Sequence, residues 1–317
     1  MVEAFTHFFV SAAVIVVAGV FLTRYSDRIA ELTKLGRLLV GSVFLAAATS
    51  LPEFFVDMSA VRTNMPNLAV GDLLGSSLFN LLILAIADLI HKDGNILFSR
   101  ASSQHALAAS MCISVTAVAG TGILLGPPLA KYSLGELGLG TASIVVAYLL
   151  GLRMIYFNQS LGTALRDSLT SGVREQRRRA LVRALGGYLM ASGAILLAAP
   201  FMAEAAGEIA EKTGIGTSFV GTTLVAFSTS LPEFVSTISA VRRGAFDLAL
   251  GNIFGSNAFN MILLAPLDLF YEGSSWLRPR SRTYLPVLPR FLSLRLLSWD
   301  SCIRWKKENA SWSPTLY

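Results

Sequence analysis

Long apolar runs alternate with short polar segments along most of the chain. A membrane-spanning helix needs roughly 20 predominantly apolar residues. By this measure the pattern predicts eight helices, at about residues 5–23, 38–62, 68–90, 105–125, 137–157, 181–203, 214–242 and 246–270. The predicted fold class is therefore an all-α polytopic membrane protein.

One stretch of this pattern occurs twice. Residues 41–90 return as residues 221–270 without a gap, and about 23 of about 50 positions are identical at an offset of 180. Each copy places one glutamate, Glu53 or Glu233, inside an apolar segment of helix length. The shared motifs are Thr-Ser-Leu-Pro-Glu-Phe at 49–54 and 229–234, and Gly-Ser-x-x-Phe-Asn at 75–80 and 255–260.

Basic residues fall in alternate loops, as consecutive membrane spans require. The positive-inside rule assigns such loops to the cytoplasm, so we expect the N-terminus outside the cell membrane. The basic loops contain Arg24, Arg28, Lys34 and Arg37; then His91, Lys92 and Arg100; then Arg166, Arg174, Arg177, Arg178, Arg179 and Arg183; and finally Arg242 and Arg243.

Five predicted spans precede the second half, and five is an odd number. The second copy must therefore enter the membrane from the opposite side, which makes the two halves an inverted-topology repeat with a substrate site between them near mid-membrane. The predicted domains are an N-terminal half at 1–157, an Arg-rich cytoplasmic linker at 158–183 and a C-terminal half at 184–273. The linker is interpreted as a solvated, orienting loop, with anionic-lipid binding or regulation as the alternative.

The last 44 residues, 274–317, depart from this plan. Two five-helix halves require ten helices, but the segment is rich in Arg, Ser, Pro and Trp and has no clean 20-residue apolar run. One interpretation is a frameshifted or disordered tail in place of the last two helices. The other is a single poor ninth helix near 284–303.

The composition agrees with a membrane protein and excludes several other classes. The chain is 53% hydrophobic and 15% charged, whereas soluble domains have about 25% charged residues. Its net charge of +6 is explained by membrane orientation, so no nucleic-acid partner and no obligate protein partner is expected. Two cysteines indicate no disulfide framework, and no nucleophile–base pair or cofactor motif is present, so the protein is not expected to be an enzyme.

The candidate chemistry lies on one face of each repeat. On a helix, the spacing i, i+3, i+4, i+7 and i+11 places polar side chains on a common face. Pro52 and Pro232 lack an N–H, so backbone carbonyls one turn earlier lose their helical partners. The face contains Ala46, Thr49, Ser50, Glu53 and Asp57 in the first copy and Ala226, Thr229, Ser230, Glu233 and Thr237 in the second.

The following helix of each copy adds Ser76 and Asn80, or Ser256 and Asn260, at i and i+4. All of these donors are hard oxygens, which suit Ca²⁺ and also Na⁺, whereas no His or Cys suits zinc or copper. Two small-residue pairs, Gly71/Gly75 and Gly251/Gly255, predict close helix approach. Asp57 and Asp72 have no acidic counterpart in the second copy, which leaves two readings open: a second acidic site or proton route, or a cap near a helix end.

Charge balance suggests how such a site works. Two buried carboxylates left unpaired cost several kcal/mol per ion, and one divalent ion, two sodium ions or protons would neutralise them. If only a neutralised site can change sides, transport is obligatory exchange. The candidate functions are a Ca²⁺/Na⁺ antiporter, a Ca²⁺/H⁺ or Na⁺/H⁺ antiporter using the same site, and a cation channel.

At the paired Thr-Ser-Leu-Pro-Glu and Gly-Ser-x-x-x-Asn motifs the chain resembles the calcium/cation antiporter superfamily, and most closely its prokaryotic sodium/calcium exchangers. The resemblance implies ten helices in two inverted halves, with helices two, three, seven and eight around the ions. Glu53 and Glu233 would bind Ca²⁺ directly, with backbone at Thr49 and Thr229. The implied sodium ligands are Ala46, Thr49, Ser50, Glu53 and Ser256, with the inverted set Ala226, Thr229, Ser230, Glu233 and Ser76, and Asn80 and Asn260 in the middle.

One ligand position departs from part of that family. Some members carry Asp at the position of Asn260, and in the potassium-dependent branch that acid is linked to K⁺. Asn260 therefore indicates an exchanger that does not depend on potassium.

Overall fold

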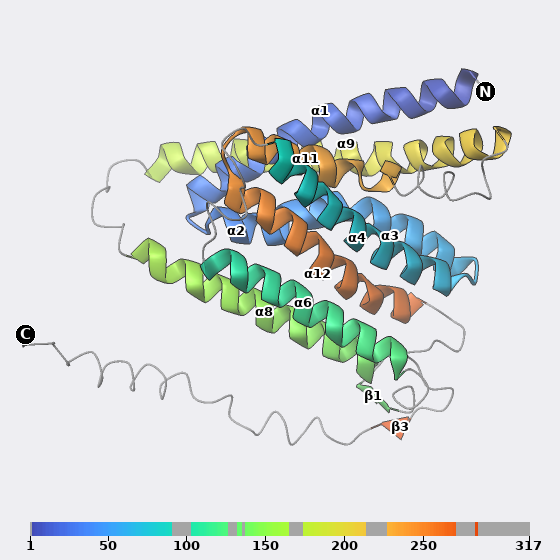
Figure 1. The fold of residues 1–317 in the computed structure, drawn as a ribbon. Coiled ribbons are helices and arrows are strands. Elements are labelled where there is room, and N and C mark those ends of the chain that lie inside the picture. Colours follow the sequence, from blue (N-terminus) through green and yellow to red (C-terminus); the bar gives the residue numbers. More distant parts are fainter. Residues whose placement is uncertain are drawn as a thin grey trace, which may run out of the picture.

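The computed structural model describes residues 2–90, 103–125, 132–134, 137–164, 174–213, 227–270 and 283–284. Nearly all of these residues are helical, and the long helices lie side by side in one bundle (Figure 1). Seven of the described helices are long and apolar enough to cross a membrane. They are α1 (Val2–Thr33), α2–η1–α3 (Arg37–Arg62), α4 (Pro66–Ile90), α6 (Ser103–Leu124), α8 (Leu139–Ala164), α9 (Arg174–Lys212) and α12 (Phe246–Phe270).

The predicted helix at 214–242 is described only from residue 227. A helical turn at 227–229 leads into α11 (Leu231–Arg242), which is 12 residues long. Helices α8 and α9 extend into the predicted 158–183 linker from both sides. The prediction ended each helix at its last apolar residue, but Arg, Ala and Glu are good helix formers and continue it.

The predicted atypical tail lies outside the described residues except for β3 (Thr283–Tyr284). This strand pairs in parallel with β1 (Tyr132–Leu134), with Tyr132 opposite Thr283. In turn β1 pairs antiparallel with β2 (Leu137–Gly138), so the strand order is β2-β1-β3. This small sheet lies beside the start of α8 (Figure 1).

Helices α4 and α12 are copies of the same sequence, and they run in opposite directions. Asn80 of α4 is bonded to Asn257 of α12, whereas Ile83, further along α4, clusters with Leu250 and Ile253, earlier in α12. The turn from α3 to α4 and the turn from α11 to α12 accordingly lie at opposite ends of the bundle (Figure 1). The fold therefore contains the inverted repeat.

Helix α12 lies at the centre of the bundle. In its most apolar 18-residue stretch 83% of the residues are buried, compared with 39% in α4. Gly251 and Gly255 allow this position, because a Cβ on Gly251 would lie 2.5 Å from the Leu38 carbonyl and one on Gly255 would lie 2.6 Å from the Ser42 carbonyl. The prediction of close approach holds for this pair but is wrong for Gly71 and Gly75, which have nothing within 4 Å among the described residues.

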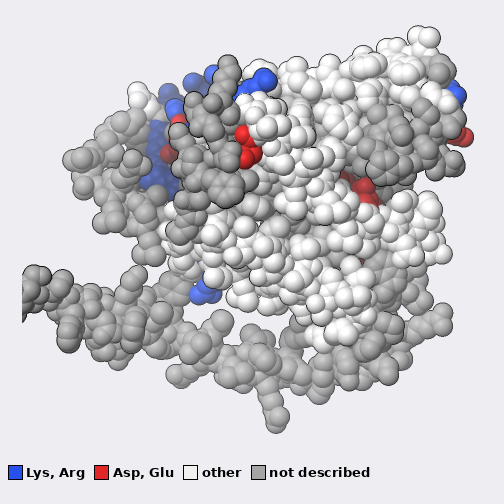
Figure 2. Space-filling model, in the orientation of Figure 1, with Lys and Arg blue, Asp and Glu red and all other residues white. Residues whose placement is uncertain are grey.

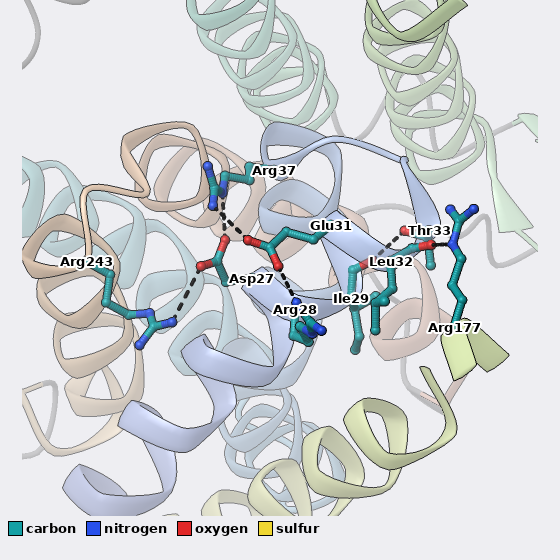
Figure 3. A network of polar contacts seen from close by, with 9 residues as sticks. All are labelled: Asp27, Arg28, Ile29, Glu31, Leu32, Thr33, Arg37, Arg177 and Arg243. Atoms are coloured by element: carbon teal, nitrogen blue, oxygen red, sulfur yellow. Dashed lines mark hydrogen bonds and ion pairs between the residues drawn. The ribbon is translucent and has the colours of Figure 1, made fainter. Parts of the chain in front are cut away.

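At one end of the bundle, charged residues tie α1 to its neighbours (Figure 3). Asp27 is nearly buried and accepts a hydrogen bond from Arg37 of α2 at 2.6 Å, and Arg243 after α11 lies 3.6 Å away. Arg177 of α9 donates to the carbonyl of Leu32 at 2.7 Å. Figure 2 shows Lys and Arg gathered at this end of the molecule, with the apolar sides of the helices largely free of charge.

Candidate cation site

The repeated Thr-Ser-Leu-Pro-Glu motif has two different local structures. In the first copy a π-helical segment, η1 (Gly41–Leu45), leads into α3 (Ala46–Arg62), which is helical through Pro52. In the second copy the helix is interrupted at Ser230, and Pro232 occupies the first turn of α11, where its missing N–H is harmless. Pro52 cannot donate to the Ala48 carbonyl one turn earlier, because proline has no N–H.

The described predicted ligands are all buried, with no more than 3% of each residue exposed. Ala226 lies outside the described residues. The eleven described ligands come from α3, α4, the turn at 227–230, α11 and α12: Ala46, Thr49, Ser50, Glu53, Ser76, Asn80, Thr229, Ser230, Glu233, Ser256 and Asn260.

Side chains from the two copies meet directly. Ser50 of α3 donates to Oε1 of Glu233 in α11 at 3.1 Å. Thr49 Oγ1 lies 3.5 Å from Ser256 Oγ of α12. Glu53 lies within electrostatic range of Glu233. Predicted ligands of α3, α11 and α12 are therefore brought into one region where the inverted halves join.

Several ligand oxygens in this region have no protein partner. Eleven buried side-chain oxygens lack a hydrogen-bond partner in the described part of the chain. Five of them belong to the predicted ligands: Glu53 Oε2, Glu233 Oε2, Ser230 Oγ, Asn80 Oδ1 and Asn260 Oδ1. A buried polar atom without a partner costs about 1–3 kcal/mol, so these five oxygens are the ones whose cost a bound cation would offset.

Two hydroxyls are used differently. Thr49 Oγ1 donates to backbone carbonyls of Leu45 and Ala46, and Ser76 Oγ donates to that of Asp72 at 2.8 Å. Donating in this way consumes the hydroxyl proton but leaves lone pairs that can still bind a cation.

Two residues of an amide network, Asn257 and Asn252, were not among the ligands predicted from the sequence. Asn257 accepts a hydrogen bond from Asn80 Nδ2 at 2.9 Å and donates to the Ser77 carbonyl at 3.0 Å. Asn252 donates to Thr237 at 3.1 Å, with its Oδ1 3.5 Å from Thr49 Oγ1. The signal available was an amide side chain inside an apolar helix. By holding the nitrogen of Asn80, Asn257 leaves the Asn80 oxygen to face a ligand.

The two asymmetric acids also pair. Asp57 in α3 and Asp72 in α4 lie close enough for their side chains to interact, at the positions that Thr237 and Asn252 occupy in the second copy, and each keeps a buried Oδ2 without a hydrogen-bond partner. Asp57 is 1% exposed and lies five residues before the end of α3, so it does not itself cap that end, and a role near the loop stays an open alternative. Both acids lie within electrostatic range of Glu53.

The donors in the site are carboxylates, hydroxyls, amide oxygens and carbonyls, the ligand types that Ca²⁺ prefers. Among the described residues, no three His, Cys, Asp or Glu side chains gather in a way that could hold a metal ion without other ligands. His105 is instead 2.6 Å from Asp247 of α12. A cation here would therefore be held by two glutamates together with neutral oxygens.

The chain matches the family model described as "Sodium/calcium exchanger protein" over residues 3–152 and 183–303. It is 30% identical to inner membrane protein YrbG of Escherichia coli over 270 residues, covering 83% of this chain and 78% of the relative. A shorter match, 45% identical over 84 residues, covers 26% of this chain and 24% of sodium/calcium exchanger MaX1 of Methanosarcina acetivorans.

Putative antiporter CaxA of Alkalimonas amylolytica is 29% identical over 262 residues, which cover 79% of this chain and 78% of the relative. Among solved structures, the fold is similar to that of sodium-calcium exchanger NCX_Mj, with a TM-score of 0.66 at 21% identity over 88% of this chain and 84% of the other.

Proposed function

Because the chain belongs to the sodium/calcium exchanger family, we propose that it is a secondary active antiporter. It exchanges Ca²⁺ for Na⁺ by alternating access, at a mid-membrane site built around Glu53 and Glu233. The observation that carries this proposal is the set of five buried, unpartnered oxygens contributed by both inverted copies.

The charge of the site supports exchange. Two glutamates contribute about −2 in a buried region, and an unpaired buried ion costs several kcal/mol. One Ca²⁺ or two Na⁺ neutralise this charge, so the two cations compete for the same carboxylates. An empty site remains charged and does not change sides, which couples the movement of one cation to the return of the other.

In this proposal the two glutamates bind both cations, and the remaining ligands belong to separate ion positions. Glu53 and Glu233 bind Ca²⁺, with backbone oxygens at Thr49 and Thr229. Sodium binds at two inverted positions, and Asn80 and Asn260 lie between them. The first sodium position uses Ala46, Thr49, Ser50, Glu53 and Ser256, and the second uses Ala226, Thr229, Ser230, Glu233 and Ser76.

The domain plan and the orientation belong to the same proposal. The halves at 1–157 and 184–273 move against each other, and 158–183 connects them on the cytoplasmic side. The membrane is the cell's inner or plasma membrane, with the N-terminus outside. The name of the E. coli relative, an inner membrane protein, and the grouping of basic residues at one end of the bundle (Figure 2) support this placement.

Proton-coupled exchange at the same site is the second candidate. The observation that favours it is the buried Asp57–Asp72 pair beside Glu53, because neighbouring buried carboxyl groups repel each other less when one of them holds a proton. In that case a proton gradient, rather than a sodium gradient, drives Ca²⁺ uptake.

The test is radioactive Ca²⁺ uptake into liposomes containing the purified protein, with an outward Na⁺ gradient, an outward proton gradient or no gradient. We expect uptake with the Na⁺ gradient alone. Glu53→Gln and Glu233→Gln should each lower the initial rate about 100-fold or more, since removing one partner of a buried ion pair costs about 3–5 kcal/mol. Glu211→Gln, an exposed acid on α9, is the matched control and should transport normally.

The outcomes separate the candidates. Uptake driven only by the proton gradient selects the proton-coupled antiporter, and uptake that needs no counter-ion selects a channel. If both glutamine variants transport Ca²⁺ as fast as the unmodified protein, the proposed site is wrong.

A further inference from the structure

An apolar groove runs between α1 and α9 on the outer surface of the bundle. Its volume is about 550 Å³, and every residue lining it is apolar or small except Tyr25. Side chains at its edges are strongly exposed, such as Val17 at 58% and Met190 at 78%. In a membrane protein, this surface faces lipid tails.

The groove has the length of a lipid chain in one leaflet. On α1 it extends from Ala13 to Tyr25, about 18 Å at 1.5 Å per residue, and half the hydrocarbon core of a bilayer is about 15 Å thick. The Tyr25 ring packs directly over Gly187, which has no side chain, so α1 and α9 lie close together at this point.

A basic pocket lies next to one end of this groove on the same helix. Its volume is about 330 Å³, and it is lined by Arg178, Arg179, Val182 and Arg183. Arg183 lies one helical turn before Gly187, which is the first α9 residue of the groove. Residues four apart share a helix face, so the cationic pocket continues the apolar groove. Figure 2 shows basic side chains gathered at this end of the molecule.

Tyr25 lies at the end of the groove nearest the arginines. Tyrosine prefers the boundary between hydrocarbon and headgroups, and arginine binds phosphate with charge-assisted hydrogen bonds. The order along the two helices is therefore apolar groove, interfacial tyrosine and arginine cluster, which is the order of acyl chain, glycerol and phosphate in a phospholipid.

We propose that the α1–α9 groove and the Arg178–Arg183 pocket form one binding site for an anionic phospholipid. The acyl chain lies in the groove, and the phosphate headgroup lies in the pocket. The charge of the pocket selects an anionic lipid over a zwitterionic one. This inference depends on the membrane placement of the helices but not on which ions the protein exchanges.

Two variants separate the parts of the site. Arg178→Gln/Arg183→Gln removes two charges from the pocket, and Ala13→Phe fills the groove from an exposed position without touching the core. Arg62→Gln/Arg242→Gln removes the same charge at two exposed positions elsewhere and is the control. Binding is measured on the purified full chain in detergent, by native mass spectrometry during titration with phosphatidylglycerol or phosphatidylcholine.

We expect phosphatidylglycerol to bind more tightly than phosphatidylcholine. The double arginine variant should weaken phosphatidylglycerol binding about 30-fold, since each cation near a membrane surface contributes about 1 kcal/mol and 1.4 kcal/mol is tenfold. Ala13→Phe should weaken the binding of both lipids, and the control variant should weaken the binding of neither. High salt should remove the preference for the anionic lipid.

Three results would overturn the site. Equal binding of the two lipids to the unmodified protein excludes a selective pocket. An arginine variant that matches its control excludes the headgroup contact. Unchanged binding in Ala13→Phe, or self-association of the protein that this substitution abolishes, shows that the groove holds no lipid chain.

Discussion

The two copies of the repeat share 23 identical positions but have different surroundings. Helix α12 is mostly buried and packs backbone to backbone on η1, whereas much of its copy α4 is exposed. Between α3 and α4 the facing polar pair is Asp57 and Asp72, whereas between α11 and α12 it is Thr237 and Asn252. The two copies of a duplicated sequence can thus carry matching candidate ligands while the residues packed around those ligands differ. Each difference can be tested by exchanging residues that lie 180 positions apart.

Glycine packing gives the largest expected contrast. Alanine in place of glycine inside a helix normally stabilises it by about 1 kcal/mol, and Gly75→Ala should do so because nothing described lies near it. Gly255→Ala should instead destabilise the protein by about 1–3 kcal/mol through overpacking against Ser42. Thermal unfolding in detergent measures both, and equal shifts for the two variants would refute the close packing of α12.

The acid pair gives the next contrast. Asp57→Thr/Asp72→Asn, which copies the second hairpin into the first, should stabilise the fold by about 1–3 kcal/mol because it replaces buried ionisable groups with neutral ones. The reverse exchange, Thr237→Asp/Asn252→Asp, should destabilise the fold by a similar amount. Thermal unfolding again provides the measurement, and a stability loss in the first variant would show that the acids hold α3 and α4 together.

The two prolines should also differ. Pro232 lies in the first turn of α11, where Pro is tolerated, so Pro232→Ala should change stability by well under 1 kcal/mol. Pro52 lies inside α3, so Pro52→Ala restores a helical hydrogen bond and should stabilise the protein. It should also slow Ca²⁺ uptake, because the new bond to the Ala48 carbonyl stiffens the backbone next to Thr49, whose carbonyl is a proposed ligand. If Pro52→Ala and Pro232→Ala took up Ca²⁺ at the same rate, backbone oxygens would be excluded as ligands of the proposed site.

The smallest contrast concerns Ser77 and Asn257. Among the described residues, Ser77 Oγ donates only to the Leu73 carbonyl of its own helix, so Ser77→Ala should change neither transport nor stability appreciably. Asn257→Ala releases the Asn80 amide and should raise the KM for Ca²⁺ about tenfold, for one lost hydrogen bond of about 1.4 kcal/mol. In an Asn80→Ala background the second substitution should add nothing. An additive effect would mean that Asn257 does not act through Asn80.

Much of the fold and of the site could be predicted from residue pattern alone. The lengths of the apolar runs predicted the membrane spans, because bilayer thickness sets the length of a spanning helix. The basic residues in alternate loops predicted that the two halves are inverted. The repeat identified Glu53, Glu233 and their hydroxyl neighbours, which the structure places together in the buried core.

What could not be predicted depends on tertiary packing. The same Thr-Ser-Leu-Pro-Glu-Phe string remains helical through Pro52 and is interrupted at Ser230, so its local conformation is decided by neighbours rather than by sequence. Likewise, Gly71/Gly75 and Gly251/Gly255 have the same spacing but different contacts. The role of Asn257 required knowing that α4 and α12 cross antiparallel, which no local pattern contains.

The ion pairs at Asp27 have a mechanical consequence. Among the described residues, the hydrogen bonds and ion pairs that join α1 to α2, α9 and Arg243 lie within residues 27–32 of α1, whereas nearer its N-terminus α1 packs on α9 through apolar side chains such as Ile15 and Met202. Any motion of α1 that preserves these bonds has its fulcrum at Asp27, and the displacement grows along the 32-residue helix toward Val2. Spin labels near residue 5 would report that motion, and labels near residue 27 would remain still.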